Sequence, residues 1–254
     1  MYRLCTFFVS LFLTLYFWSL SVFALIFTYS VCLFISPFVD SKTISRTYET
    51  LTGKFLLYAM TAPGFWTLTV KDNRRDKSWS YYDADAEEQE RQYVIIANHM
   101  SFIDSLISVV IPLKKKYMVA RAFTKFPVFS WLTLNSGYVL AERGNPEVNG
   151  QAVNKAIAAM QDGSSFLLFP QGRRVEKVEN LETFKTGAYR IAQRQGVAIL
   201  PLTYKNTHIA MPLGGWVYPA DIEIIIDEPF YVETDNYEEY IVQSQDIMRR
   251  NLEK

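Results

Sequence analysis

Cysteine and histidine are scarce in this sequence. The two cysteines, Cys5 and Cys32, both lie in an apolar N-terminal stretch, and only two histidines occur among 254 residues. This distribution offers neither a disulfide framework nor metal-ligand spacing, so we expect no metal site. Net charge is absent too, because 26 lysines and arginines balance 26 aspartates and glutamates. Nucleic-acid-binding proteins normally carry a basic excess, so we expect no nucleic-acid partner.

Charged residues and glycine are missing between Leu4 and Phe38, and the first proline is Pro37. A helix of ~20 apolar residues spans a bilayer, so this stretch is long enough for a tilted span or for a span with an interfacial extension. Two short re-entrant helices are an alternative, although no turn residue separates them. A cleaved signal peptide would have an apolar region of only ~7 to 15 residues. The stretch therefore predicts an integral membrane anchor.

Basic residues flank this anchor unequally. Arg3 precedes it, whereas Lys42, Arg46 and Lys54 follow it, and the positive-inside tendency then places the rest of the chain in the cytosol. A second apolar run, residues 55–60, is too short to span and favours a helix lying on the membrane surface. We therefore expect residues 1–62 to form a membrane anchor with an interfacial helix, and residues 63–254 to form the main domain.

The main domain alternates apolar or β-branched runs with helical patterns, which is typical of an α/β fold. We expect a mixed, mostly parallel central sheet flanked by helices. Strands are predicted at 65–70, 93–96, 117–120, 165–169, 197–204 and 221–226, and helices at 106–111, 146–160, 184–194 and 237–252. Pro201 favours an edge position or a bulge for its strand. Two charged stretches, 71–92 and the lysines 114–116, indicate surface loops, the first with a short helix near 84–91.

A histidine follows the buried strand at 93–96, at the turn into a helix. Open α/β sheets place their sites at such turns, and an imidazole can take a proton from a hydroxyl near neutral pH. If the helix begins near Ser101, the carboxylate of Asp104 lies in its first turn and points back to His99 as in a His–Asp dyad. Alternatively, Ser101 and Asp104 form an ordinary helix N-cap.

A second strand, at 165–169, runs into Pro170-Gln171-Gly172-Arg173-Arg174. Arginine forks bind phosphate oxygens bidentately and stay charged when partly desolvated, so this loop suits a phosphate group. The alternative is a pair of surface arginines that form ion pairs with Glu176 and Glu179. His208, the other histidine, has no partner motif, and we expect it to be structural or on the surface.

Together these segments resemble the glycerolipid acyltransferase family, whose best-known members are 1-acylglycerol-3-phosphate acyltransferases. The family has five motifs, and this sequence matches them in the same order. NHxxxxD is matched by Asn98, His99 and Asp104, and a glycine shortly before an arginine is matched by Gly137 and Arg143. FPEGTR is matched by Phe169 to Arg174, FKxGA by Phe184, Lys185, Gly187 and Ala188, and an apolar run around proline by residues 199–202. The resemblance covers roughly Tyr93 to Tyr204.

The third motif departs from the family pattern at two positions. Gln171 stands where the family has glutamate, and Arg173 stands where it has threonine. Glutamine keeps a hydrogen-bond acceptor and loses the negative charge, so the loop becomes more electropositive. A different acceptor head group or a lower activity would follow from this change.

The resemblance implies transfer of a fatty acyl group from acyl-CoA to the free hydroxyl of a lysophospholipid, foremost 1-acylglycerol-3-phosphate, or of glycerol phosphate. His99 would be the general base, Asp104 would orient it, and backbone donors near the helix N-terminus would stabilise the oxyanion. The resemblance also implies substrate-binding roles for Asn98, Gly137, Arg143, Gln171, Gly172, Arg173, Arg174 and Lys185. A thioester is reactive enough to require no cofactor and no metal.

Two other functions stay open. One is a CoA-independent transacylase, which takes its acyl chain from another phospholipid, and the other is a membrane-anchored lipid-binding protein without turnover. In each case the bilayer is a partner, with the endoplasmic reticulum as the membrane if the source is eukaryotic. The sequence names no protein partner.

Overall fold

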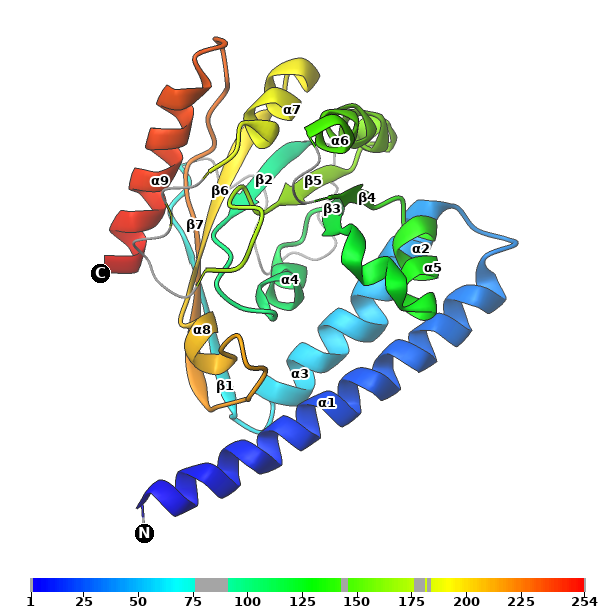
Figure 1. Ribbon diagram of the computed structural model, residues 1–254, viewed down its shortest axis with the longest axis vertical. Helices are drawn as coiled ribbons and strands as arrows, with labels where there is room; N and C mark the ends of the chain where they lie inside the picture. Colours follow the sequence, from blue (N-terminus) through cyan, green and yellow to red (C-terminus); the bar gives the residue numbers. More distant parts are fainter. Residues whose placement is uncertain (1, 76–90, 143–145, 176–180, 182–183, 254) are drawn as a thin grey trace.

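The computed structural model describes residues 2–75, 91–142, 146–175, 181 and 184–253. Its centre is a seven-stranded sheet in the order β1-β7-β6-β2-β5-β3-β4 (Figure 1). Neighbouring strands are parallel throughout except for the antiparallel pair β6 and β7. The predicted mixed, mostly parallel sheet flanked by helices is confirmed.

The strands are β1 (Trp66–Asp72), β2 (Tyr93–Ala97), β3 (Lys115–Ala120), β4 (Val139–Ala141), β5 (Ser165–Leu168), β6 (Ala198–Lys205) and β7 (Ala220–Ile226). The α-helices are α1 (Tyr2–Ile35), α2 (Ser41–Tyr48), α3 (Phe55–Thr61), α4 (Asp104–Ile107), α5 (Pro127–Asn135), α6 (Pro146–Ala159), α7 (Gly187–Gln195), α8 (Thr207–Ala210) and α9 (Tyr237–Glu253). A π-helical turn, η1 (Glu49–Lys54), joins α2 to α3, and 3-10 turns form η2 (Ser108–Val110), η3 (Arg121–Lys125) and η4 (Met160–Asp162).

Strand β2 is buried on both faces, as its unbroken apolar sequence requires. Its residues 93, 95 and 97 enter one core, to which α1, α3 and α4 also contribute. Its residues 94 and 96 enter a second core, shared with α6, α7 and α9. In Figure 1 the helices α6 and α7 accordingly lie above the sheet and α1 and α3 below it. The sheet thus presents the carboxyl end of β2, where His99 follows, between two helical layers.

Helix α1 is long and apolar enough to cross a membrane, by length and composition. One stripe of it is nevertheless buried against the rest of the chain: Ser10, Leu13, Phe17, Ala24, Thr28 and Cys32. Their spacing follows one face of an α-helix. The opposite face exposes large apolar side chains such as Phe12, Phe23 and Phe34. The helix therefore lies along the molecule as one of its walls.

A loop after α8 holds the N-terminal half of α1. The Ser10 hydroxyl donates to the carbonyl of Val217 at 3.0 Å, and the Trp18 indole N–H donates to the carbonyl of Gly215 at 2.9 Å. Residues about two hundred positions apart thus lie side by side, as Figure 1 shows for the orange loop and the blue helix.

Two expectations about the sheet were wrong. Strand β6 is interior, between β7 and β2, although it contains Pro201. The proline is tolerated because it lies one residue before the first paired position with β7, Leu202 opposite Ile226. Lys115 and Lys116 are buried residues of β3 and not part of a solvated loop. Most of the charged stretch 71–92, with its expected helix near 84–91, lies outside the described residues.

Candidate active site

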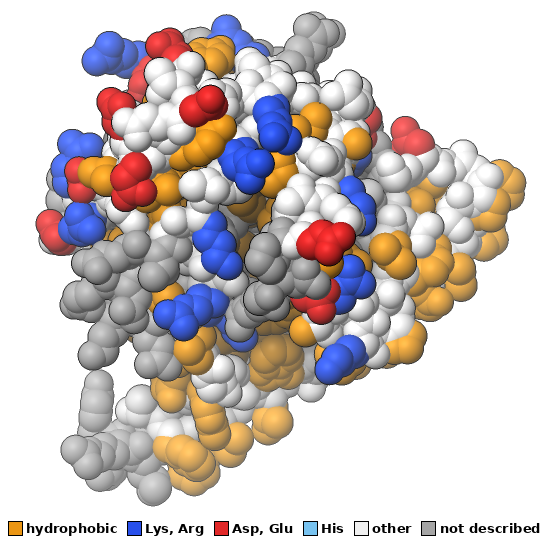
Figure 2. Space-filling view, turned by 45° about the horizontal axis from the view of Figure 1, so that its top comes forward, with side chains coloured by type: hydrophobic (Ala, Val, Ile, Leu, Met, Phe, Trp, Pro, Cys, Tyr) orange, Lys and Arg blue, Asp and Glu red, His pale blue; other side chains and the backbone are white. Residues whose placement is uncertain are grey.

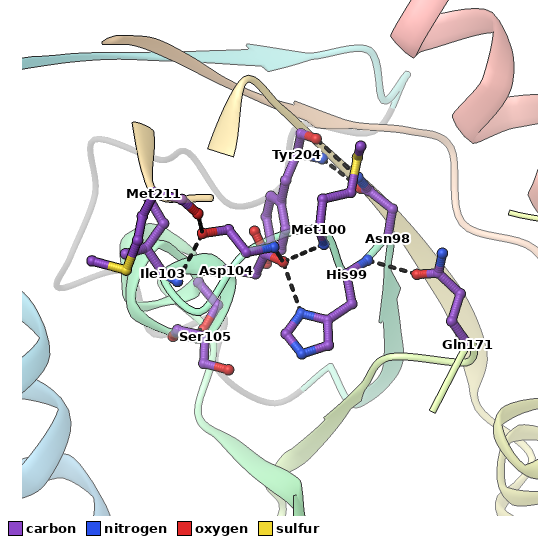
Figure 3. A network of polar contacts seen from close by, with 11 residues as sticks. Asn98, His99, Met100, Ile103, Asp104, Ser105, Gln171, Tyr204 and Met211 are labelled. Carbon is purple, nitrogen blue, oxygen red and sulfur yellow. Dashed lines mark hydrogen bonds and ion pairs between the residues drawn. The ribbon is translucent and has the colours of Figure 1, made fainter. Parts of the chain in front are cut away.

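His99 and Asp104 form the predicted pair (Figure 3). The imidazole Nδ1 lies 2.7 Å from Oδ2 of Asp104, which also accepts hydrogen bonds from the backbone N–H groups of Met100 at 2.7 Å and Ser101 at 2.8 Å. The Asp104 side chain is fully buried, whereas the His99 side chain is 18% exposed. A carboxylate bound in this way fixes the proton on Nδ1 and leaves Nε2 as the basic nitrogen.

The local helix begins later than expected. Helix α4 starts at Asp104 itself, and Ser101 lies in the preceding turn and not at the N-cap. The Ser101 hydroxyl donates to the carbonyl of Met211 at 2.6 Å and accepts from the N–H of Ile103 at 3.3 Å. The turn is therefore tied to the segment after α8, and Asp104 reaches back from the first helical position.

Asn98 fixes the other end of this turn. It is fully buried, its amide nitrogen donates to the carbonyl of Tyr204 at 2.9 Å, and its amide oxygen accepts from the N–H of Tyr204 at 2.7 Å. Strands β2 and β6 are neighbours, so this clamp joins their carboxyl ends. Both contacts of the Asn98 amide are with backbone, which makes Asn98 a positioning residue for His99 in this structure. Its substrate-binding role stays a prediction.

The loop after β5 encloses His99 from the other side, because β5 is the second neighbour of β2. The side-chain oxygen of Gln171 accepts from the His99 N–H at 2.6 Å, and the Val175 N–H donates to the His99 carbonyl at 2.9 Å. The Phe169 ring stacks on the imidazole with 4.0 Å between centroids and 12° between planes. Sequence reasoning missed this contact, although Phe169 belongs to the third motif.

Cationic side chains border the same loop. Gly172 adopts a φ of +67°, which favours glycine, and a Cβ atom built on it would lie 2.9 Å from Nζ of Lys185. The Lys185 N–H donates to the carbonyl of Pro170 at 2.9 Å. Arg173 is exposed, and Arg174 is half-buried. The predicted substrate-binding residues Gly172, Arg173 and Arg174 thus lie in the loop after β5 together with Gln171, and Lys185 contacts this loop.

The two residues of the second motif do not join this group in the described structure. Gly137 follows α5, with a φ of +70° and a bond from its N–H to the carbonyl of Leu134. It precedes β4, an edge strand parallel to β3, so it lies at the opposite end of the sheet from His99. Arg143 lies outside the described residues.

Several backbone donors around the dyad are already engaged. Asp104 accepts the N–H groups of Met100 and Ser101, and Gln171 accepts that of His99. These three N–H groups are therefore bound to the protein's own side chains, and oxyanion donors near the helix N-terminus stay a prediction. Among the described residues, no group of histidine, cysteine and carboxylate side chains is arranged to hold a metal ion.

Comparisons with known proteins agree with the motifs. The family model described as Acyltransferase matches residues 78–205, about half of the chain. A chloroplastic 1-acyl-sn-glycerol-3-phosphate acyltransferase of Brassica napus is 30% identical over 140 residues, which are 54% of this chain and 40% of that protein. A 1-acyl-sn-glycerol-3-phosphate acyltransferase of Haemophilus influenzae is 26% identical over 171 residues, which are 65% of this chain and 70% of that protein.

A solved structure shares the fold. The 1-acyl-sn-glycerophosphate acyltransferase PlsC of Thermotoga maritima superimposes with a TM-score of 0.74 at 22% identity, covering 100% of this chain and 97% of that one. The plant relatives are longer, since this chain spans about two fifths of the length of the Brassica protein.

Proposed function

Since the chain belongs to the acyltransferase family, we propose that it transfers a fatty acyl group from acyl-CoA to the free hydroxyl of a lysophospholipid. The proposed acceptor is 1-acylglycerol-3-phosphate and the product phosphatidic acid, in keeping with the printed names of its relatives. The observation that carries the proposal is the 2.7 Å contact between His99 Nδ1 and Asp104 Oδ2.

In the proposed reaction, Nε2 of His99 takes the proton of the acceptor hydroxyl as its oxygen attacks the thioester carbonyl. Asp104 keeps the proton of the resting imidazole on Nδ1 and stabilises the imidazolium. The tetrahedral intermediate then collapses, the carbon–sulfur bond breaks, and the His99 imidazolium gives its proton to the leaving CoA thiolate, which restores the neutral base. The thioester needs neither an enzyme nucleophile nor a metal in this scheme.

The acceptor phosphate would be held by the loop after β5. Arg174, Arg173 and Lys185 provide donors for phosphate oxygens, and the absence of a side chain at Gly172 lets backbone and ligand approach. We keep Arg143, which comes two residues after β4 in the sequence, as a fourth candidate.

We further propose that α1 attaches the protein to a membrane. Between Cys5 and Ile35 the helix has no charged residue, and its exposed face is rich in phenylalanine and leucine. Figure 2 shows apolar side chains gathered along the lower and right margins of that view, away from most lysines and arginines. Lipid substrate and product both reside in a bilayer, so an attached enzyme meets them there. The cytosolic orientation of the catalytic domain follows from the flanking basic residues.

The test measures acyl transfer from labelled acyl-CoA to 1-acylglycerol-3-phosphate in membranes that contain the protein. We expect His99→Ala to lower the rate by about 10²- to 10⁴-fold. For Asp104→Asn we expect a loss on the order of 10⁴-fold, because the amide favours the wrong imidazole tautomer. His208→Ala, which removes the other histidine, serves as the matched control and should keep the activity.

Parallel assays with an acyl carrier protein thioester and with a phospholipid donor separate the alternatives. Turnover from phospholipid alone would replace our proposal with a transacylase. Product formation that survives His99→Ala with every donor would overturn the role of the dyad.

A further inference from the structure

Helix α1 reaches the catalytic turn through one aromatic contact. The indole of Trp18 lies against the ring of Phe102, with 5.6 Å between centroids and 44° between planes. Phe102 belongs to the turn between His99 and Asp104. Hydrogen bonds hold this turn, from the N–H groups of Met100 and Ser101 to Asp104 and from the Ser101 hydroxyl to the carbonyl of Met211. The N-terminal helix is thus in direct contact with the segment that carries the dyad.

The Phe102 ring also contacts a candidate phosphate-binding residue, Arg174. The guanidinium carbon of Arg174 is 6.0 Å from the centroid of Phe102, at the outer range of a cation–π contact. Within the described part of the chain, Arg174 has no acidic partner and no hydrogen-bonded side chain. Among the described side chains, the Phe102 ring is therefore the group in contact with the Arg174 guanidinium. The N–H donors of this guanidinium remain available for a ligand.

Trp18 is itself firmly placed. Its N–H donates to the carbonyl of Gly215 at 2.9 Å, and the adjacent Phe17 packs on Trp66, with 5.8 Å between ring centroids. The Trp66 indole in turn donates to the carbonyl of Tyr218 at 3.0 Å. Phe102, Trp18, Phe17 and Trp66 are consequently linked by successive ring contacts.

We propose that Trp18 and Phe102 are positioning residues that hold Arg174 toward the phosphate of the acceptor, so that α1 contributes to head-group recognition. This inference rests on the proposed function. A free arginine side chain loses rotamer entropy when it is fixed on a ligand. A ring that restricts the guanidinium beforehand lowers this loss, and binding becomes tighter without a new contact to the ligand.

The experiment compares two acceptors that differ only in the phosphate, 1-acylglycerol-3-phosphate and 1-acylglycerol. For each variant we measure kcat/KM with both acceptors and take their ratio as the phosphate preference. We expect Trp18→Leu and Phe102→Leu each to lower this ratio by about two- to fivefold, the size of an exposed cation–π contact. The loss should appear in KM for the phosphate-bearing acceptor.

Two matched variants separate positioning from general damage to α1. Trp18→Phe keeps an aromatic ring against Phe102 and loses the bond to Gly215, so it should keep the preference. Tyr29→Leu removes the aromatic contact of α1 with Trp131, 5.4 Å between centroids, at the other end of the helix. It should leave the preference unchanged. A drop of equal size in Tyr29→Leu and Trp18→Leu would overturn the proposal.

A double-mutant cycle tests the route through Arg174. In an Arg174→Gln background, Phe102→Leu should cause no further loss of phosphate preference, because the group that it positions is gone. Additive losses would overturn the proposal. Calorimetric titration with glycerol 3-phosphate gives a readout that does not depend on turnover. Weaker binding in Trp18→Leu than in Trp18→Phe upholds the positioning role even if the acyl transfer reaction is refuted.

Discussion

Gln171 is one of the two residues at which the third motif departs from the family pattern, and its contacts explain how this departure is tolerated. Its side-chain oxygen accepts from the His99 N–H at 2.6 Å, a bond that a glutamate would make equally well. Its amide nitrogen is buried and has no hydrogen-bond partner among the described residues. The support of His99 therefore needs an acceptor at position 171, and the missing negative charge changes only the electrostatics of the site.

Restoring that charge gives a prediction. In Gln171→Glu, the added negative charge lies in the loop that carries Arg173 and Arg174 and should weaken its attraction for the acceptor phosphate. KM for 1-acylglycerol-3-phosphate should therefore rise severalfold. KM should not change in Gln161→Glu, which places the same charge on an exposed residue. An unchanged KM in Gln171→Glu would contradict this effect of the charge.

At this scale the dyad was predictable, because His99 and Asp104 are close in the chain and the turn alone can join them. The ring contacts were not. Phe169 reaches His99 because β5 pairs with β2, and Trp18 reaches Phe102 because α1 folds under the sheet. The run of three lysines also led to a wrong prediction, a solvated loop at Lys116. Its ammonium is buried and lies 2.7 Å from Asp162 and 2.8 Å from the carbonyl of Ala159. Such partners are tertiary and leave no trace in local spacing.

At the scale of elements, α1 has one face buried against the rest of the chain and one exposed apolar face. We expect substitutions on the first face to change stability and substitutions on the second to change membrane binding. Leu13 is fully buried, so Leu13→Ala should lower the free energy of unfolding by about 2–5 kcal/mol.

Phe23 is 60% exposed on the other face, so Phe23→Lys should leave folding intact and weaken membrane binding. A lysine in the hydrocarbon region costs about 3 kcal/mol relative to phenylalanine.

Flotation of the variants with lipid vesicles measures the second effect, and denaturant unfolding in detergent measures the first. Membrane binding that survives Phe23→Lys but fails in Leu13→Ala would contradict the assignment of the two faces. Each variant thus acts as the control of the other.

The elements of the sheet were largely visible in the sequence, since buried parallel strands are uniformly apolar and short. The predicted strands and the structure differ by one or two residues at most ends. The connections were harder to predict. Segment 41–54, with α2 and the π-helical η1, was not predicted, because its amphipathic pattern is short and its packing partner is α1. Helix α4 begins three residues after the expected start near Ser101, at Asp104, and only one turn of it is α-helical.

For the whole molecule, the expected division at residues 62 and 63 has a testable consequence. Leu13, Phe17, Leu57 and Met60, all before that division, are buried in the same core as Trp66 and β2. Burying four such side chains contributes on the order of 10 kcal/mol, comparable with the total stability of a domain. We therefore expect a chain of residues 63–254 to lose its cooperative unfolding transition.

Circular dichroism and thermal unfolding of that shortened chain in detergent provide the measurement. A cooperative transition like that of the full chain would show that residues 1–62 are an independent anchor. Aggregation or a broad transition would show that the anchor helices complete the catalytic domain.

The bond between Ser10 and Val217 also sets an order of events while the protein is being made. The ribosome releases α1 long before it has synthesised the loop that covers this helix. During that interval the buried stripe of α1 lacks the residues on which it packs in the folded chain. If α1 attaches to a membrane as proposed, it lies there first, and the main domain packs onto it once residues 215–217 emerge.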